Sequence, residues 1–250
     1  FLHDLQLLSR NRSGFPVKIL FRDDAIQSMV RLDNGKPLGL LELEPEEVTH
    51  FFGPDREKRQ LVSIDQVPEH LIRAVLAAED HRFFHHHGFD VRGILRALLA
   101  NLREGRIRQG GSTITQQLAK SYFLTPRRTF RRKFKELLMA LTMEAMYDKN
   151  VLLEIYLNEI YLGQKGSVGI NGVGEASYFY FGKPVTDLTL PEAAVIAGLI
   201  RGPNLYSPFK GPKRCRERRD TVLRAMHEQA WISRKALTGA LTTPIKTIPA

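Results

Sequence analysis

The sequence predicts a mainly α-helical protein preceded by a partial β-rich accessory segment. From about residue 60 onward, apolar residues recur at helical spacing. Before residue 48, short apolar runs alternate with turn signals instead. A hydrophobic fraction of 43% over 250 residues is ordinary for a chain that buries a core. We therefore expect an accessory module over residues 1–48 and one larger domain over residues 49–250.

The accessory segment reads as short strands joined by tight turns. Strands are predicted over residues 17–22 and 25–32. Asn34 and Gly35 predict a hairpin turn, because this pair readily takes positive φ. Residues 38–43 would then return as a third strand. The segment contains no residues whose chemistry we recognise.

The first helix of the larger domain begins after Ser63 and ends at two carboxylates. Pro68 suits its first turn. Glu79 and Asp80 stand at its end. Its apolar stripe is formed by Val67, Leu71, Val75 and Ala78.

A second amphipathic helix is predicted over residues 91–102. Its stripe falls at helical spacing on Val91, Ile94, Leu95, Leu98, Leu99 and Leu102. Burial in the core is the usual fate of such a stripe. The rival interpretation is a helix at a membrane surface, with Arg92, Arg96 and Arg103 at the lipid headgroups.

Further helices complete the predicted domain. Ser112 is expected to cap the first of them, and Gly163 to close the third. Thr189 and Glu192 form a capping box before the fourth. The predicted helices cover residues 112–123, 127–145, 148–162, 193–200 and 217–232.

The charge balance favours an anionic partner. Thirty-seven Lys and Arg against 27 Asp and Glu give a net charge of +10, which suits a nucleic acid, a membrane surface or a phosphorylated substrate. A basic cluster could support nucleic-acid binding, although a solvated helix face is the commoner meaning. The cluster consists of Lys213, Arg214, Arg216, Arg218 and Arg219. These basic neighbours would lower the pKa of Cys215, the single cysteine.

Glu79 and Asp80 are the first candidates for catalysis. The helix macrodipole disfavours negative charge at a helix end, so a carboxylate there tends toward a raised pKa. A raised pKa suits a general base that works near neutral pH. For a Glu-Asp pair taken alone, a solvated helix end is the commoner interpretation. Phe83 and His86 crowd the following turn and Gly88 ends it, which indicates a structured loop facing the acids.

Residues 110–113, Gly-Gly-Ser-Thr, place exposed backbone N–H groups at a helix start, where anions bind readily. Ser112 acting as a plain N-cap is compatible with that binding role. Gln117 and Lys120 are three residues apart and share a helix face. They could present an amide and an ammonium group to a phosphate or a sugar.

Arg128, Arg132 and Glu136 lie four residues apart, on one side of one helix. They form either a solvated salt-bridge ladder or a site in which the arginines bind a charged group. Two separated carboxylates and a phosphate-binding cluster describe sugar transfer from a glycosyl phosphate. One carboxylate takes the proton of the acceptor hydroxyl, and the cations stabilise the departing phosphate.

These residues stand in motifs that resemble the peptidoglycan glycosyltransferase module, family 51, of class A penicillin-binding proteins. The resemblance covers about residues 60–230. The initial segment resembles the latter part of the small UvrB-domain-2-homologue module found in the 1b type. The motifs are Glu79-Asp80-x-x-Phe83-x-x-His86-x-Gly88, Gly110 to Gln117 with Lys120, Arg132-Lys133-x-x-Glu136, Tyr156-Leu157-Asn158-x-Ile160-Tyr161-x-Gly163 and Tyr180-Phe181-Gly182-Lys183.

The resemblance implies a lysozyme-like glycosyltransferase head with a small membrane-facing jaw. It implies that Glu79 is the catalytic base acting on the 4-hydroxyl of acceptor lipid II. The attacked carbon is C1 of the growing chain, and undecaprenyl pyrophosphate leaves with inversion. Glu136 matches the second essential acid, at the leaving-group side.

The resemblance also implies a substrate-binding set. Lys120, Arg128 and Arg132 match cations that bind the pyrophosphate, and Ser112 and Gln117 match donor-site polar contacts. Asp80 and Lys133 complete the set. A divalent cation such as magnesium is expected at the pyrophosphate, with no organic cofactor and no metal held by the protein alone. Ser121 departs from the family's usual Asn, which puts one donor-site hydrogen bond in doubt.

The expected partners are lipid II, the growing lipid-linked glycan, a membrane surface and a moenomycin-type inhibitor in the donor site, but no nucleic acid. Residues 122–130 are the expected lipid contact. Phe1 opens the chain without a signal-peptide pattern, which favours a piece of a longer anchored protein at the periplasmic face of the cell inner membrane. The alternatives are a lysozyme-like hydrolase or lytic transglycosylase, and a basic nucleic-acid-binding module.

Overall fold

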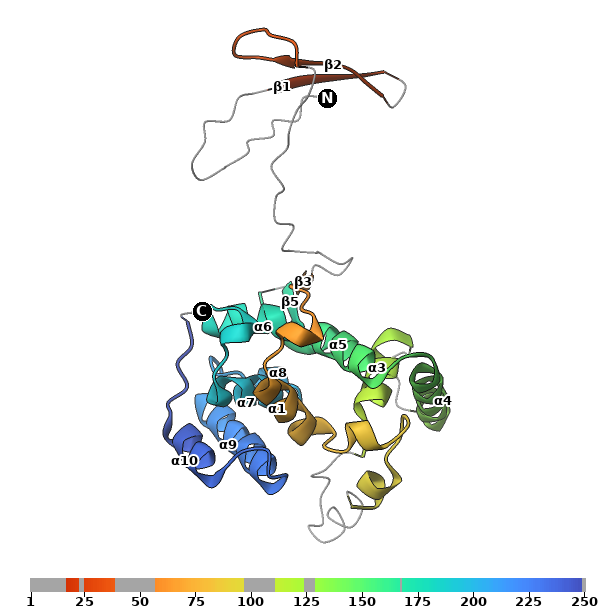
Figure 1. Ribbon diagram of the computed structural model, residues 1–250, viewed down its shortest axis with the longest axis vertical. Coiled ribbons are helices and arrows are strands. Elements are labelled where there is room, and N and C mark those ends of the chain that lie inside the picture. The colour runs from red at the N-terminus through yellow and green to blue at the C-terminus, as the bar shows by residue number, and fades with distance from the viewer. Residues whose placement is uncertain are drawn as a thin grey trace. The chain divides into compact units, whose positions relative to one another are not determined.

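The computed structural model forms two compact units, Phe1–Val48 and Thr49–Ala250 (Figure 1). The residues that the structure describes are 17–22, 25–38, 57–96, 111–123, 129–166 and 168–248.

The first unit contains a two-stranded antiparallel sheet. β1 (Val17–Arg22) pairs with β2 (Ala25–Arg31), and both lie where strands were predicted. After β2 the chain turns tightly, with Gly35 at φ 69° and its N–H donating to the carbonyl of Arg31. The predicted third strand lies outside the described residues apart from Leu38.

The second unit is mainly helical, which confirms the predicted fold class. Its helices are α1 (Glu69–Glu79), α3 (Ile114–Phe123), α4 (Phe130–Met146), α5 (Lys149–Glu159), α6 (Val173–Phe181), α7 (Leu190–Leu199), α8 (Pro203–Tyr206), α9 (Pro212–Glu228) and α10 (Arg234–Thr242). A small sheet in the order β3-β5-β4 joins β3 (Glu57–Arg59), β4 (Tyr161–Lys165) and β5 (Val168–Asn171). Short 3-10 turns cover Ile64–Gln66, Phe83–His85 and Val185–Asp187.

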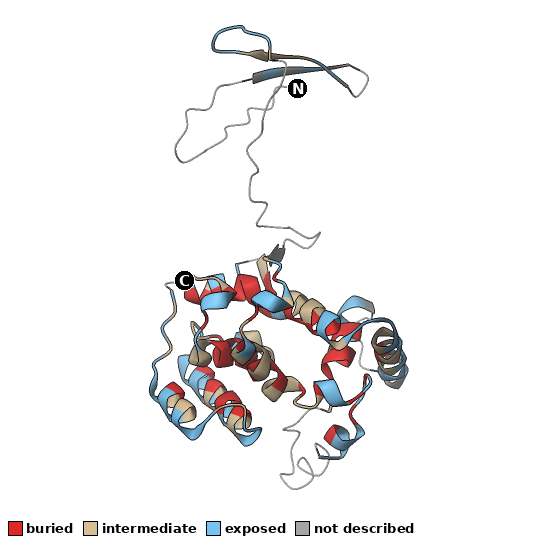
Figure 2. Cartoon of the chain, viewed as in Figure 1, coloured by how far each residue is buried: buried red, intermediate tan, exposed pale blue. Residues whose placement is uncertain are grey.

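The core is built around α7. Every residue from Ala193 to Leu199 is buried, as expected of a helix that is apolar all round. α7 packs against α1 and α9, and α1 also packs against α9. The capping box of Thr189 and Glu192 is present at its start, as predicted. Figure 2 shows the buried residues on the inward faces of these helices.

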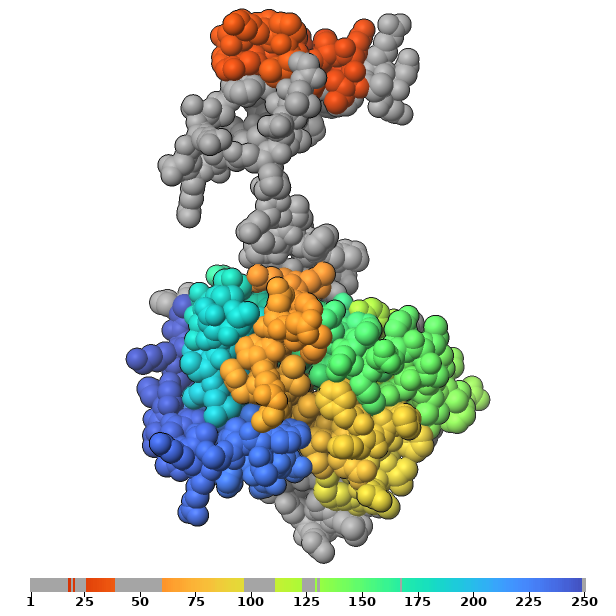
Figure 3. All heavy atoms as spheres, in the orientation of Figure 1, coloured from red at the N-terminus to blue at the C-terminus, as the bar shows by residue number. Residues whose placement is uncertain are grey.

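α1 ends at the first candidate carboxylates, Glu79 and Asp80. Leu71 and Val75 of its predicted stripe are completely buried. The helix ends at Glu79, and the N–H of Asp80 closes it on the carbonyl of Leu76 at 2.8 Å. In Figure 3 the segment that follows β3 (orange to yellow) runs between α9 (blue) and the α3–α5 region (green).

The helix predicted over residues 148–162 is too long. α5 ends at Glu159, and Tyr161 starts β4, which pairs with β5. Gly163 therefore does not cap a helix. A Cβ atom on Gly163 would lie 2.4 Å from the hydroxyl of Tyr180, so this close approach is what the glycine permits. The pairing of β4 with β5 overrides the helical periodicity.

The basic cluster on α9 is not one solvated face. Arg219 is completely buried, and its guanidinium donates to the carbonyls of Thr243 at 2.6 Å and Leu241 at 3.1 Å. These bonds tie α9 to the end of α10. Burial raises the pKa of Cys215 to about 11, opposite to the lowering that its basic neighbours suggested.

The stripe of the second predicted helix is not buried where the structure describes it. Residues 91–96 are helical, yet Val91, Ile94 and Leu95 are all exposed. Core burial is therefore wrong for these three residues, and the rest of the stripe lies outside the described residues.

Of the segment predicted to contact lipid, the structure describes little. Tyr122 is 50% exposed. The side chains of Phe123 and Phe130 lie outside the described residues, as does the chain between them from residue 124 to 128. No helix in the described ranges combines the length and apolar character needed to cross a membrane.

Candidate active site

Glu79, at the end of α1, is a partly buried carboxylate held by one neutral donor. The side-chain amide of Gln117 donates to its Oε2 at 3.0 Å. Burial raises the pKa of Glu79 above its ordinary value, while the Gln117 hydrogen bond and the charges of Arg218 and Arg201 oppose the rise. The net result is a carboxylate that accepts a proton more readily than an exposed glutamate does.

Gln117 is itself fixed from the other side. The hydroxyl of Tyr156, on α5, donates to its Oε1 at 3.2 Å. Burial raises the pKa of Tyr156 well above its ordinary value, so the phenol keeps its proton. A chain of hydrogen bonds thus runs from Tyr156 through Gln117 to Glu79. The amide of Gln117, expected to meet a phosphate or sugar, is committed to Glu79 in this structure.

Asp80 points away from this chain and is buried. Its Oδ2 accepts from the N–H of Ile114 at 3.1 Å and lies 3.0 Å from Nε2 of His86. The start of α3 therefore does hold an anion, as the sequence suggested, but the anion is the protein's own carboxylate. Thr113, rather than Ser112, caps α3, because its hydroxyl accepts from the N–H of Gln116 at 3.2 Å. This geometry favours positioning of α3 over substrate contact for Asp80.

The turn after Asp80 contacts both the start of α3 and the backbone of α4. The hydroxyl of Thr113 donates to the carbonyl of Gly88 at 2.7 Å. Gly88 has φ +83°, and a Cβ there would lie 3.1 Å from backbone atoms of Ala140 in α4. Phe83 is completely buried, with the ammonium of Lys149 4.2 Å from its ring centroid. Glycine is required here by both the backbone conformation and the close approach.

Glu136, on α4, is a buried carboxylate that accepts from two cations. Arg132 Nη1 lies 2.9 Å from Oε2, and Lys133 Nζ lies 2.5 Å from Oε1. Lys133 also reaches Ser112 Oγ at 2.8 Å and Gln116 Oε1 at 3.3 Å. The cluster formed by Arg132, Lys133 and Glu136 keeps a net positive charge, which suits an anionic ligand.

Lys120, Arg128 and Ser121 make no contact with Glu79 or Glu136 that the structure describes. Lys120 is exposed on α3, and Arg128 lies outside the described residues. Ser121 turns back on its own helix, donating to the carbonyl of Leu118 at 2.8 Å. Within the described part of the chain, no three His, Cys, Asp or Glu side chains gather to hold a metal ion.

Two arginines near Glu79 were not identified as site residues from the sequence. The charges of Arg218 and Arg201 both act to lower the Glu79 pKa. Arg218 packs closely on α7, since a Cβ on Gly198 would lie 3.0 Å from its Cγ. Its Nε is buried without a hydrogen-bond partner. Arg218 lies in a run of basic residues, and nothing in the sequence distinguishes it from the others in that run.

Comparison with known proteins gives consistent matches. The family model described as transglycosylase matches residues 45–227. Penicillin-binding protein 1B of Escherichia coli (strain K12) is 39% identical over 232 residues, which cover 93% of this chain and 28% of that protein. Penicillin-binding protein 1A of Aquifex aeolicus is 49% identical over 189 residues, which cover 76% and 26%.

The chain spans less than a third of the length of these curated relatives. Among solved structures, the crystal structure of penicillin-binding protein 1A from Haemophilus influenzae aligns at 25% identity with a TM-score of 0.45. That alignment covers 78% of this chain and 19% of the other.

Proposed function

We propose that this chain, which belongs to the transglycosylase family, polymerises lipid II into glycan strands. The observation that carries the proposal is the environment of Glu79. Its carboxylate is half-buried, its pKa is raised by burial, and Gln117 holds one oxygen at 3.0 Å. A carboxylate so prepared suits a general base for a sugar hydroxyl.

In the proposed reaction, Glu79 removes the proton from the 4-hydroxyl of acceptor lipid II. The hydroxyl oxygen forms a bond to C1 of the growing chain on the face opposite the pyrophosphate. The bond from C1 to the pyrophosphate oxygen breaks, and its electron pair leaves with undecaprenyl pyrophosphate. The configuration at C1 is inverted because the attack comes from the opposite face.

Cations replace the general acid of a hydrolase at the leaving group. The cluster of Arg132, Lys133 and Glu136 keeps one uncompensated positive charge beside Ser112. Glu136 supports this role by holding both cations in place, which preorganises them for the developing pyrophosphate charge. Lys120 and Arg128 are proposed to complete the pyrophosphate site.

Magnesium is proposed to assist at the pyrophosphate. Such an ion usually keeps several waters and takes one or two carboxylates with phosphate oxygens. The described residues gather no larger set of ligands, so the phosphates and water would supply most of its coordination. The ion would add positive charge at the leaving group.

We further propose that the chain works at the periplasmic face of the inner membrane as part of an anchored protein. A net charge of +10 and the exposed Val91, Ile94 and Leu95 support contact with an anionic bilayer. A moenomycin-type inhibitor is proposed to occupy the donor site, because its phosphate would meet the same cations.

Incubation of the chain with lipid II, followed by separation of the products by size, tests the function. Glycan longer than the substrate supports polymerisation, and failure to extend lipid II in a folded chain would refute it. Shortening of a preformed glycan would instead indicate a hydrolase or lytic transglycosylase, which the comparisons do not favour. Nucleic-acid binding is also not favoured, since Arg219 of the basic cluster is completely buried.

A further inference from the structure

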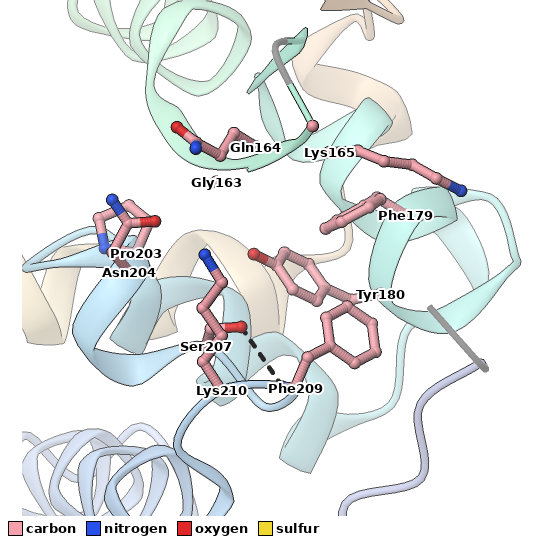
Figure 4. Close-up of a pocket in the computed structure, with 11 residues that line it drawn as sticks. Gly163, Gln164, Lys165, Phe179, Tyr180, Pro203, Asn204, Ser207, Phe209 and Lys210 are labelled. Carbon is pink, nitrogen blue, oxygen red and sulfur yellow. Dashed lines mark hydrogen bonds between the residues drawn. The ribbon is translucent and has the colours of Figure 1, made fainter.

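A cavity of about 210 Å³ lies apart from the proposed active site. It opens between β4, α8 and the turn after α8, next to two aromatic residues of α6 (Figure 4). None of the residues placed in the reaction above lines it. The cavity is small for a whole cofactor site, and its size suits one or two residues of a larger ligand.

The back wall of the cavity is aromatic and rigid. Tyr180 is 2% exposed, and its hydroxyl donates to the carbonyl of Leu162 at 2.8 Å. The Tyr180 ring stacks on Phe209 with centroids 5.5 Å apart and meets Phe179 edge-on. Stacking covers one face of both Tyr180 and Phe209, so the wall is better suited to a small apolar side chain than to a stacked sugar ring.

The mouth of the cavity is polar and positively charged. The side chain of Lys210 points toward β4, between Asn204 and Tyr180. Gln164 supplies a second amide from β4, and Lys165 a second ammonium group. The lining residues, all of them described, include no carboxylate, so an anionic group would be attracted to this mouth.

A sheet edge borders the same space. β4 is one of the two outer strands of the sheet β3-β5-β4, and residues 163–166 all line the cavity in succession. An edge strand carries unpaired N–H and C=O groups. An extended peptide can pair with such an edge while its side chains enter adjoining pockets.

We propose that this cavity binds a short acidic peptide in an extended conformation. Its carboxylate lies at Lys210, its main chain follows β4 with the amides of Asn204 and Gln164 alongside, and a small apolar side chain meets the aromatic wall. Resting on the proposed function, we assign this peptide to the stem of the lipid-linked substrate, which carries free carboxylates and alanine methyl groups.

α8 connects the cavity with the active site. Asn204 lines the cavity. Burial lowers the pKa of the Arg218 guanidinium, and Tyr206, two residues after Asn204, is near enough to oppose that lowering. The charge of Arg218 in turn acts on Glu79. A peptide held beside α8 would therefore help to place the attached sugar near the proposed base.

Direct binding tests the proposal without catalysis. The probe is the soluble stem peptide L-Ala-γ-D-Glu-meso-diaminopimelyl-D-Ala-D-Ala, titrated into the chain by NMR and calorimetry. Lys210→Ala should weaken binding about tenfold, the loss of one charge-assisted contact. Lys213→Ala is the matched control, because Lys213 is also exposed and does not line the cavity. The peptide with amidated carboxylates should bind the parent and Lys210→Ala equally weakly.

Three outcomes would overturn the cavity assignment. They are no binding of the stem peptide to the parent, equal binding by the two lysine variants, and N-acetylmuramic acid alone binding as well as the peptide. The last outcome would assign the cavity to an acidic sugar.

Polymerisation assays separate this proposal from the proposed function. Lys210→Ala should raise KM for lipid II about tenfold at unchanged kcat, with no change for the lipid-linked disaccharide that lacks a peptide. An equal effect on both substrates would overturn the peptide assignment while the polymerase stands. A parent chain that binds peptide but cannot polymerise would refute the proposed function alone.

Discussion

Replacing Gln117 by methionine tests how Glu79 is prepared for proton transfer. Methionine keeps the length and helix propensity of glutamine but removes the amide. The carboxylate then loses the donor now 3.0 Å from its Oε2, and the Tyr156 hydroxyl loses the acceptor now 3.2 Å away. A hydrogen bond to a charged group contributes about 1.5–3 kcal/mol, so kcat/KM at neutral pH should fall roughly 10- to 100-fold.

The pH profile shows in which direction the pKa of Glu79 changes in Gln117→Met. The Gln117 hydrogen bond lowers the pKa of Glu79, so its removal should raise that pKa further. The acidic limb of kcat/KM reports the pKa of the base in the free enzyme. This limb should move to higher pH in Gln117→Met, which makes the deficit largest at acidic pH and smaller at alkaline pH.

Initial rates of lipid II polymerisation across pH, with melting temperatures for each variant, measure the effect. Tyr156→Phe is the matched control, because it removes the outer hydrogen bond while leaving the amide of Gln117 on Glu79. Its acidic limb should lie close to that of the parent. A Gln117→Met variant with the parent's rates and pH profile would show that this hydrogen bond does not govern the base.

Three further perturbations probe the rest of the proposal. Glu79→Gln should cut polymerisation by roughly 10²–10⁴-fold. Because the folded state raises the Glu79 pKa, the parent loses stability as this proton leaves with rising pH, so the melting temperature of Glu79→Gln relative to the parent should increase with pH. A flat difference would contradict the raised pKa. Arg132→Ala should lower the rate of donor use more than Arg132→Lys, which keeps the charge; parental activity of the alanine variant would assign Arg132 to a surface ladder. Combined Val91→Ser and Leu95→Ser changes, both at exposed positions, should reduce flotation with anionic liposomes at unchanged melting temperature. Leu61→Ser, also at an exposed position, is the control. An equal loss of flotation in this control would argue against a specific membrane face.

Sequence reasoning identified the helices that have strong local signals. The capping box of Thr189 and Glu192 and the buried run after it are present as predicted, because both depend on neighbouring residues. The end of α5 was misplaced because β4 forms only by pairing with β5. Ser112 and Thr113 are adjacent residues with hydroxyl groups. The sequence alone does not show that Ser112 contacts Lys133 while Thr113 caps the helix.

The sequence predicted the site contacts that lie within one helix but not those between helices. Glu136 and Arg132 pair at 2.9 Å on one helix, as their spacing indicated. The contact of Gln117 with Glu79 joins different helices, and a helix periodicity cannot report it. Arg218 stood among basic residues of similar appearance, and only the packing of α9 on α7 brings it inward.

The carboxylates of Glu79, Asp80 and Glu136 have different hydrogen-bond partners, and these partners indicate different roles. Asp80 accepts from a backbone N–H and pairs with His86, while Glu136 accepts from two cations. These contacts occupy oxygens of Asp80 and Glu136, so both carboxylates hold neighbouring groups of the protein in place. Glu79 has one neutral donor and burial that disfavours its charge. A raised pKa suits a general base, so the assignment of the base to Glu79 follows from its environment as well as from its position in the chain.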